Sequence, residues 1–148
     1  MEDWEIEARE SIRDLVARYN ANGDSGRFDE MLELFAEDAV METPGDRREG
    51  RAAIRAMFEG IAETPSGTPR ARFVRHFTAT HQIDVLDRAH ARGRAYYTVL
   101  TDQGLDHWGR YVDDYRRVEG RWLFAHRRAL LDAAVPGGWG DRGAGEVD

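Results

Sequence analysis

The sequence predicts an α+β domain in which helices come first and cover one face of a curved antiparallel sheet. Before the loop at residues 64–69, apolar residues recur at helical spacing in three segments. After this loop the chain continues in long β-prone runs that short turns separate. Helices followed by antiparallel strands are the element order of the α+β class, and a pocket is expected between the two layers.

Three helices are expected in the first part of the chain. The first covers residues 4–22 and ends in the turn-forming stretch 20–26. Its apolar face consists of Ile12, Leu15, Val16 and Tyr19. A second helix is expected around Phe28, Met31, Leu32 and Phe35, and a third after Gly50 around Ile54, Met57, Phe58 and Ile61. Between them, residues 39–42 should form a short strand.

Four long strands are expected in the second part of the chain. They cover residues 71–86, 94–101, 107–118 and 121–131. Because residues 87–93 and 119–120 are hairpin-length connections, the strands should form an antiparallel meander. The Gly-rich segment 136–148 is expected to be a flexible tail, so the domain itself covers residues 1–135.

The composition narrows the function. The chain has 148 residues, 41% of them hydrophobic, which suits one domain with its own core. A net charge of −7 disfavours a nucleic acid or an anionic membrane as partner, so the expected ligand is a small molecule. There is no Cys, and all 21 basic residues are Arg, which excludes thiol nucleophiles, Cys-based zinc sites and Schiff-base lysines. Apolar runs stay short of the ~20 residues of a membrane span and the first residues are acidic, so a cytoplasmic location is expected.

Several segments together resemble a SnoaL-like domain of the nuclear transport factor 2-like superfamily. They are residues 18–20, 35–40, 49–54, 75–76, 109–111 and 119–122. The resemblance extends to Leu131 and implies a cone-shaped, curved antiparallel sheet wrapped by three N-terminal helices. It is specific for the fold but not for the substrate, because this fold hosts many unrelated activities.

Dehydratases of this superfamily offer the best residue-level comparison. Scytalone dehydratase and the bile-acid dehydratase use an Asp in the loop after the first helix and a His on an early strand. The bile-acid enzyme adds a Tyr five residues before the Asp. Tyr19, Asp24 and His76 stand at the matching places, so the resemblance implies that these three residues are catalytic.

Two other enzyme groups of the superfamily match less well. Ketosteroid isomerase resembles the chain in Tyr19 and Asp113, but its general-base Asp would fall at Thr43, which cannot accept a proton reversibly near neutral pH. Steroid isomerisation by that enzyme's mechanism is therefore not expected. Polyketide cyclases also use a His and Asp pair, but their residues do not align closely with this sequence.

Strand alternation divides the residues around His76 between two faces. One face would carry Val74, His76, Thr78, Thr80 and Gln82, and the other Phe73, Phe77, Ala79, Ile83 and Val85. The residues alone favour a polar row that faces solvent, whereas the resemblance favours a row that lines a pocket. The same alternation puts His76 and His81 on opposite faces, so no shared metal site is expected.

Each remaining candidate has a structural alternative. Asp24 could cap the second helix instead of orienting His76. Tyr19 lies on an apolar helical face, which by itself predicts core packing. The resemblance puts Asp113 on the inward face with His107, Gly109, Tyr111 and Tyr115. There Asp113 could have a raised pKa and donate a hydrogen bond to a substrate, or it could form an ion pair with an arginine.

The residues and the resemblance together predict a cofactor-free and metal-free acid–base enzyme, a dehydratase or an isomerase. Its substrate would be a small, mostly apolar carbonyl compound of polyketide, steroid or terpenoid type. The expected catalytic residues are His76, Asp24 and Tyr19, and the expected substrate-binding residues are Tyr111, Asp113, Thr78, Tyr97, Phe58 and Trp108. The alternative is a small-molecule-binding domain without catalysis, or an association subunit like the β subunit of ring-hydroxylating dioxygenases. A homodimer is expected in either case, with a trimer as the other possibility.

Overall fold

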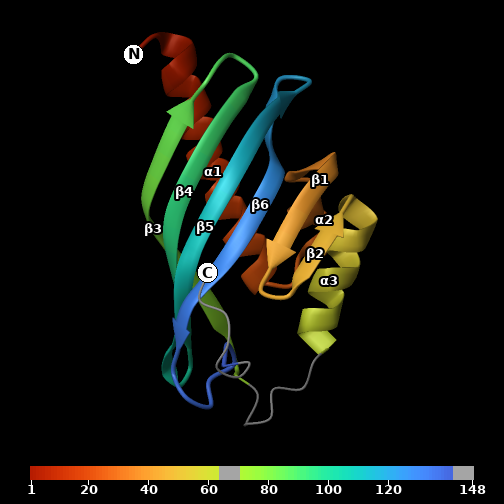
Figure 1. The fold of residues 1–148 in the computed structure, drawn as a ribbon, viewed down its shortest axis with the longest axis vertical. Helices are drawn as coiled ribbons and strands as arrows, with labels where there is room; N and C mark the ends of the chain where they lie inside the picture. The colour runs from red at the N-terminus through yellow and green to blue at the C-terminus, as the bar shows by residue number, and fades with distance from the viewer. Residues whose placement is uncertain (64–70, 142–148) are drawn as a thin grey trace.

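The protein folds into one layer of helices against one six-stranded sheet (Figure 1). The structure is a computed structural model and describes residues 1–63 and 71–141. The helices are α1 (Asp3–Asp24), α2 (Phe28–Leu32) and α3 (Arg51–Glu63). The strands are β1 (Phe35–Thr43), β2 (Asp46–Glu49), β3 (Val74–Val85), β4 (His90–Thr101), β5 (Gly104–Val118) and β6 (Arg121–Ala134).

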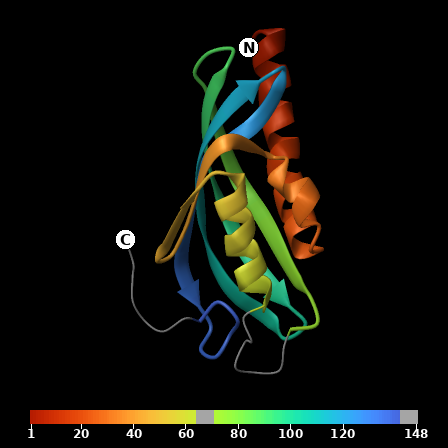
Figure 2. The same ribbon diagram turned by 90° about the vertical axis from the view of Figure 1, so that its right-hand side faces the viewer.

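The sheet has the order β2-β1-β6-β5-β4-β3. Neighbouring strands are antiparallel except β1 and β6, which are parallel. The chain between these two strands contains β2, α3 and β3–β5 and provides the long connection that a parallel pair needs. The helices lie on one face of the curved, open sheet, as the turned view shows (Figure 2). The predicted α+β class with helices over one sheet face is therefore confirmed. No helix of the described ranges is long and apolar enough to cross a membrane.

Helix α1 forms one wall of the core. Its buried residues repeat at helical spacing: Ala8, Ile12, Leu15, Val16 and Tyr19. A capping box between Glu2 and Glu5 begins the helix, and Asp24 ends it, two residues later than predicted. This longer end matters for the site, because it includes Asp24, which hydrogen-bonds His76 on β3.

The start of the sheet differs from the prediction. Phe35 was expected in the second helix, but it begins β1 and is fully buried, with its ring centroid 5.2 Å from that of Phe124 on β6. The parallel pairing with β6 outweighs the helical spacing of a short segment. Strand β2 was not predicted, because its residues Asp46–Glu49 are all charged and show no apolar alternation.

Strand β4 begins at His90, four residues earlier than predicted. Small residues alternate inward along this early part, and one of them is Gly93. A Cβ atom at Gly93 would lie 2.7 Å from the ring of Tyr115, so this glycine makes room for a core aromatic and does not mark a turn.

A β-bulge in β3 changes which residues face the helices. The pairing with β4 shifts by one residue between Ala79 and Gln82, and Thr80 adopts a positive φ of 52°. After the bulge the inward residues are His81, Ile83 and Val85, while Thr80 and Gln82 are exposed. The simple alternation predicted for this strand is therefore wrong beyond Ala79, and so is the inference that His76 and His81 face opposite ways.

The segment after β6 is described as far as Asp141. Val135 and Gly138 are joined by a backbone hydrogen bond of 3.0 Å, and Gly138 and Asp141 by another of 3.0 Å. Residues 142–148 of the expected tail lie outside the described residues. The division into a domain and a flexible tail stays a prediction.

Gly109→Ala should lower the free energy of unfolding. The added Cβ would overlap the carbonyl oxygen of Leu130 and lie 2.7 Å from the hydroxyl oxygen of Tyr97. Overpacking of this kind costs about 1–3 kcal/mol, which urea denaturation can measure. Gly60→Ala is the matched control: apart from its own helix and chain neighbours, no atom of the described residues lies within 4 Å of its Cβ position in α3, so it should raise stability by roughly 0.5–1 kcal/mol. An unchanged stability of Gly109→Ala would contradict the described packing.

Candidate active site

Asp24 and His76 form a hydrogen-bonded pair between the end of α1 and β3. Asp24 Oδ1 lies 2.6 Å from His76 Nδ1, and Asp24 Oδ2 accepts a 2.8 Å hydrogen bond from the backbone N–H of His76. Both side chains are largely buried, 9% exposed for Asp24 and 19% for His76. The N-cap position of α2 is Arg27, so the helix-capping alternative for Asp24 does not hold.

This geometry fixes the chemistry of the imidazole. An ionised carboxylate only accepts hydrogen bonds, so Nδ1 of His76 carries the proton that faces Asp24. The neutral ring then presents Nε2 as a proton acceptor, and the carboxylate stabilises the imidazolium that forms when Nε2 takes a proton. The pair is therefore arranged as a base with its orienting carboxylate.

Hydrogen bonds tie the end of α1 to the strands around His76. Asn20 donates from Nδ2 to Thr78 Oγ1 at 2.9 Å, and Tyr111 donates its hydroxyl to Asn20 Oδ1 at 3.2 Å. The ring of Tyr97 lies 4.6 Å from that of Tyr111 and 6.2 Å from that of His76. Tyr97 donates its hydroxyl to a backbone carbonyl of β6 at 2.9 Å. The structure thus brings Thr78, Tyr97 and Tyr111 together beside His76, and their role in substrate binding stays a prediction.

Tyr19 occupies the centre of the aromatic core. Its ring makes edge contacts with the rings of Phe58, Tyr111 and Phe124, at centroid distances of 6.2, 6.0 and 5.5 Å. Burial raises the pKa of Tyr19 to about 12, so its hydroxyl keeps its proton and can act only as a neutral donor. Phe58 is partly buried and packs against this core. The substrate-binding role expected for Phe58 stays a prediction.

Asp113 forms a buried ion pair with Arg127. Two hydrogen bonds of 2.9 Å join the carboxylate to Arg127 Nε and Nη2, and both side chains have no exposed surface. The hydroxyl of Tyr115 donates to the same carboxylate at 2.8 Å. The structure therefore shows the ion-pair alternative for Asp113. As an acceptor from three donors, Asp113 is not the hydrogen-bond donor to substrate that was expected.

Sequence reasoning missed Arg127, which is the most deeply buried charge of the site. Its guanidinium carbon lies 3.7 Å from the ring centroid of Tyr111 and 4.3 Å from those of Tyr19 and Phe124. Burial acts to lower its pKa, but Asp113 outweighs burial and raises the pKa, so the cation persists. Its Nη1 is buried without a hydrogen-bond partner in the described part of the chain. Arg127 lies opposite Asp113 in the pairing of β5 with β6, a register that no local pattern in the sequence indicates.

Trp108 does not join the other expected residues. Alternation along β5 buries His107, Gly109 and Tyr111 on the inner face, and Trp108 lies between them in sequence on the outer face, where it is only partly buried. The period of two along the strand therefore separates Trp108 from the other expected substrate-binding residues, and its role in substrate binding stays a prediction.

A second His and Asp pair lies next to the first. Asp106 Oδ2 lies 2.7 Å from His107 Nδ1, and the rings of His107 and His76 have centroids 6.4 Å apart. His107 was expected on the inward face of this strand, without a role in the site. Across the described ranges, no group of three or more His, Cys, Asp or Glu side chains comes together as a metal site.

His81 ends a hydrogen-bonded chain that leads to the buried ion pair. Its Nε2 lies 3.1 Å from the hydroxyl oxygen of Tyr115, which in turn donates to Asp113. Burial lowers the pKa of His81 below its ordinary value of 6.5.

This shift predicts a loss of stability on acidification. As the pH falls through 6.5, the unfolded chain takes up a proton at His81 that the folded chain binds only at a lower pH. The free energy of unfolding should therefore decrease over this range. The substitution His81→Gln should remove this part of the slope in urea titrations at a series of pH values, whereas His90→Gln on the exposed β3–β4 turn should leave it in place. An unchanged slope in His81→Gln would refute the assignment.

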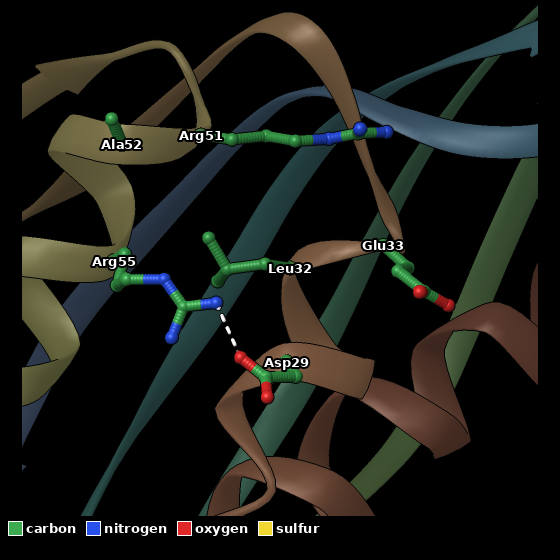
Figure 3. A pocket seen from close by; sticks show the side chains of 6 residues that line it. All are labelled: Asp29, Leu32, Glu33, Arg51, Ala52 and Arg55. Carbon is green, nitrogen blue, oxygen red and sulfur yellow. Dashed lines mark hydrogen bonds and ion pairs between the residues drawn. The ribbon is translucent and has the colours of Figure 1, made fainter.

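A surface hollow with a volume of about 370 Å³ lies elsewhere, between α2 and α3 (Figure 3). Its lining residues are Asp29, Leu32, Glu33, Arg51, Ala52 and Arg55. An ion pair of 2.5 Å joins Arg55 to Asp29 across it. The hollow shares no residue with the His76 site, and its charged lining does not suit an apolar carbonyl compound, so the candidate active site is not placed there.

Fold and site together define a class: an α+β domain with a helical layer over a curved, open sheet and a buried His–Asp pair between them. The family model of the SnoaL-like domain matches residues 4–128. The chain therefore belongs to the SnoaL-like domain family, within the nuclear transport factor 2-like superfamily. No curated protein matches the sequence.

Solved structures share the fold over nearly the whole chain. A provisionally assigned scytalone dehydratase from Novosphingobium aromaticivorans has a TM-score of 0.79 at 22% identity, with 91% of each chain covered. A hexachlorocyclohexane dehydrochlorinase from Novosphingobium barchaimii has a TM-score of 0.76 at 16% identity, covering 90% of this chain and 92% of its own. The β subunit of a provisionally assigned aromatic-ring-hydroxylating dioxygenase from N. aromaticivorans has 0.72 at 18% identity, covering 88% and 93%. At these identities the likeness shows the fold alone.

Proposed function

We propose that this SnoaL-like protein is a cofactor-free acid–base enzyme that moves a proton next to a carbonyl group, as a dehydratase or an isomerase. The observation that carries the proposal is the Asp24–His76 pair, which is buried beside an aromatic core and has the imidazole oriented by a carboxylate. Two of the structural neighbours are named for eliminations, one of water and one of hydrogen chloride, which supports this reaction class.

In the proposed reaction, Nε2 of His76 removes the proton α to the substrate carbonyl. Negative charge then develops on the carbonyl oxygen. The neutral hydroxyl of Tyr19 and the cation of Arg127 are the groups proposed to stabilise it. A positioned base typically contributes about 10²–10⁴-fold to the rate, and one well-placed donor about 10²–10³-fold.

The surroundings of the pair favour a mostly apolar substrate. The rings of Tyr97, Tyr111 and Tyr19 pack in series, with Tyr97 beside His76, and burial raises the pKa of each of them, so all three stay uncharged near neutral pH. A polyketide-, steroid- or terpenoid-like carbonyl compound fits such a lining.

Turnover of a panel of aryl-substituted β-hydroxy ketones tests the proposal. Loss of water gives a conjugated enone, whose ultraviolet absorbance reports the reaction without any added cofactor. Enone formation above the buffer rate, together with its loss in Asp24→Asn, would support the proposed enzyme activity. If the protein binds these ketones but neither exchanges their α protons nor eliminates water from them, the non-catalytic alternative is favoured.

That alternative is a small-molecule-binding domain or an association subunit of a larger complex. The dioxygenase β subunit among the structural neighbours has the same fold, which keeps this function in consideration. Purification from the native source with a large iron–sulfur subunit would support it and would count against a free-standing enzyme.

We also propose that two copies of the chain associate through the outer face of the sheet. Phe77 on β3 and Tyr96 on β4 are each 57% exposed on this face, and Trp108 on β5 is partly exposed there. Light scattering should give the mass of a dimer, and Tyr96→Arg should give that of a monomer. A monomeric wild-type protein would rule the association out, and a trimer would change its symmetry.

A cytoplasmic location stays a prediction.

A further inference from the structure

The second His–Asp pair repeats the arrangement of the first one across the sheet. His76 pairs with Val99 on β4, and Val99 pairs with His107 on β5, so the two histidines lie in one cross-strand row on the inner face. Val99 between them is fully buried. The centroids of the two imidazole rings are 6.4 Å apart and their planes are nearly perpendicular, at 86°. The second imidazole is therefore within reach of a small substrate that contacts the first one.

Asp106 is held more firmly than a packing role requires. Besides the hydrogen bond with His107, its carboxylate accepts backbone N–H groups of Trp139 and Gly140, each at 2.7 Å. Burial acts to raise the pKa of Asp106, but these hydrogen bonds outweigh burial and lower the pKa, so the carboxylate remains ionised. An ionised carboxylate beside Nδ1 can stabilise an imidazolium at His107.

The chain after β6 is shaped to hold this imidazole. The ring of Trp139 lies 5.4 Å from that of His107, on which Tyr97 also packs at 6.0 Å. A Cβ atom at Gly140 would overlap the His107 ring, so only glycine lets the backbone close over it. Burying two carboxylates and two imidazoles in one place costs the fold free energy of desolvation. In return, the two pairs could supply two separate acid–base groups to one substrate.

We propose that His107 is a second catalytic residue, the acid that protonates the leaving group while His76 acts as the base. This inference rests on the proposed dehydratase function. Before the reaction His76 is neutral and His107 is an imidazolium. Nε2 of His76 takes the α proton, and the C–H electron pair forms the new double bond. The β-carbon–oxygen bond breaks toward oxygen, which takes the proton from Nε2 of His107 and leaves as water. A proton then passes from His76 to His107 through solvent and restores the starting state.

The leaving group distinguishes an acid from a base. A β-hydroxy ketone needs a proton on its departing oxygen, whereas the matching β-(nitrophenoxy) ketone releases a stable phenolate that needs none. His107→Gln should lower kcat on the hydroxy ketone by about 10²-fold or more and leave kcat on the nitrophenoxy ketone within roughly threefold. His76→Gln should lower both, because both reactions begin with the α proton. His90→Gln, a histidine paired with Asp87 on an exposed turn, is the control and should lower neither.

Asp106→Asn provides a second variant, and it should repeat the selective loss on the hydroxy ketone to a smaller extent. Circular dichroism and thermal melting confirm that each variant is folded before its kinetics are compared. Equal losses on both ketones in His107→Gln would mean that His107 only shapes the site, and unchanged rates on both would mean that it is not used; either result overturns the inference and leaves the proposed function standing. Full activity of His76→Gln on both ketones would instead overturn the proposed function.

Discussion

Replacing His76 by Gln should lower turnover of a β-hydroxy ketone by about 10²–10⁴-fold, the typical contribution of a positioned general base. Glutamine keeps much of the size of the imidazole but cannot accept a proton reversibly. Asp24→Asn should also be strongly impaired, because an amide no longer stabilises the imidazolium and no longer selects the tautomer with Nε2 unprotonated. The rate of enone formation, measured by absorbance at saturating ketone, gives both effects.

The exposed His90–Asp87 pair is the matched control for this prediction. It has the same residue types, with Nδ1 of His90 3.0 Å from Asp87 Oδ1, but both side chains are more than half exposed on the β3–β4 turn. His90→Gln should leave turnover unchanged. If the His76 and Asp24 variants both kept full turnover, the acid–base scheme would be wrong.

Removing one partner of the Arg127–Asp113 ion pair should cost about 3–5 kcal/mol of stability. Arg127→Met leaves the Asp113 carboxylate buried with the Tyr115 hydroxyl as its remaining donor from this cluster. A buried charge without its counterion pays a desolvation penalty that packing of the methionine does not offset. The midpoint and slope of urea denaturation give the loss, with far-ultraviolet circular dichroism as the probe.

Two comparisons make this second prediction specific. Asp14→Asn breaks the exposed Arg18–Asp14 pair on α1, where the side chains are 63% and 58% exposed, and should cost no more than about 1 kcal/mol. The double variant Arg127→Met with Asp113→Leu removes both charges and should recover most of the loss. A loss below about 1 kcal/mol in Arg127→Met would contradict the buried geometry.

The sequence predicts the helices and the meander well where one face of an element is apolar over several turns or strand periods. The stripe from Ile12 to Tyr19 is such a case, and α1 forms as predicted. Phe35 and the bulge at Thr80 are different, because their conformations depend on partners far away in sequence. One bulged residue in β3 reverses the inward set beyond it, and no local pattern of apolar residues announces this change.

The candidate site divides in a similar way. The resemblance to dehydratases supplied Tyr19, Asp24 and His76, and the structure brings Asp24 and His76 into direct contact. Arg127 and the His107–Asp106 pair were missed, because their roles arise from cross-strand pairing and from a turn after β6. In the sequence, Arg127 is one arginine among many, and Asp106 and His107 are two polar residues near the start of a strand.

The most direct test of the account is hydrogen exchange at the substrate α carbon. A β-hydroxy ketone is incubated with the protein in deuterium oxide, and proton NMR follows the loss of the α-proton signal. The account predicts exchange catalysed by the wild-type protein and by His90→Gln, and none above the buffer rate by His76→Gln. Equal exchange with and without His76, or no exchange over buffer by the wild-type protein across the ketone panel, would contradict the claim that this pair is a base.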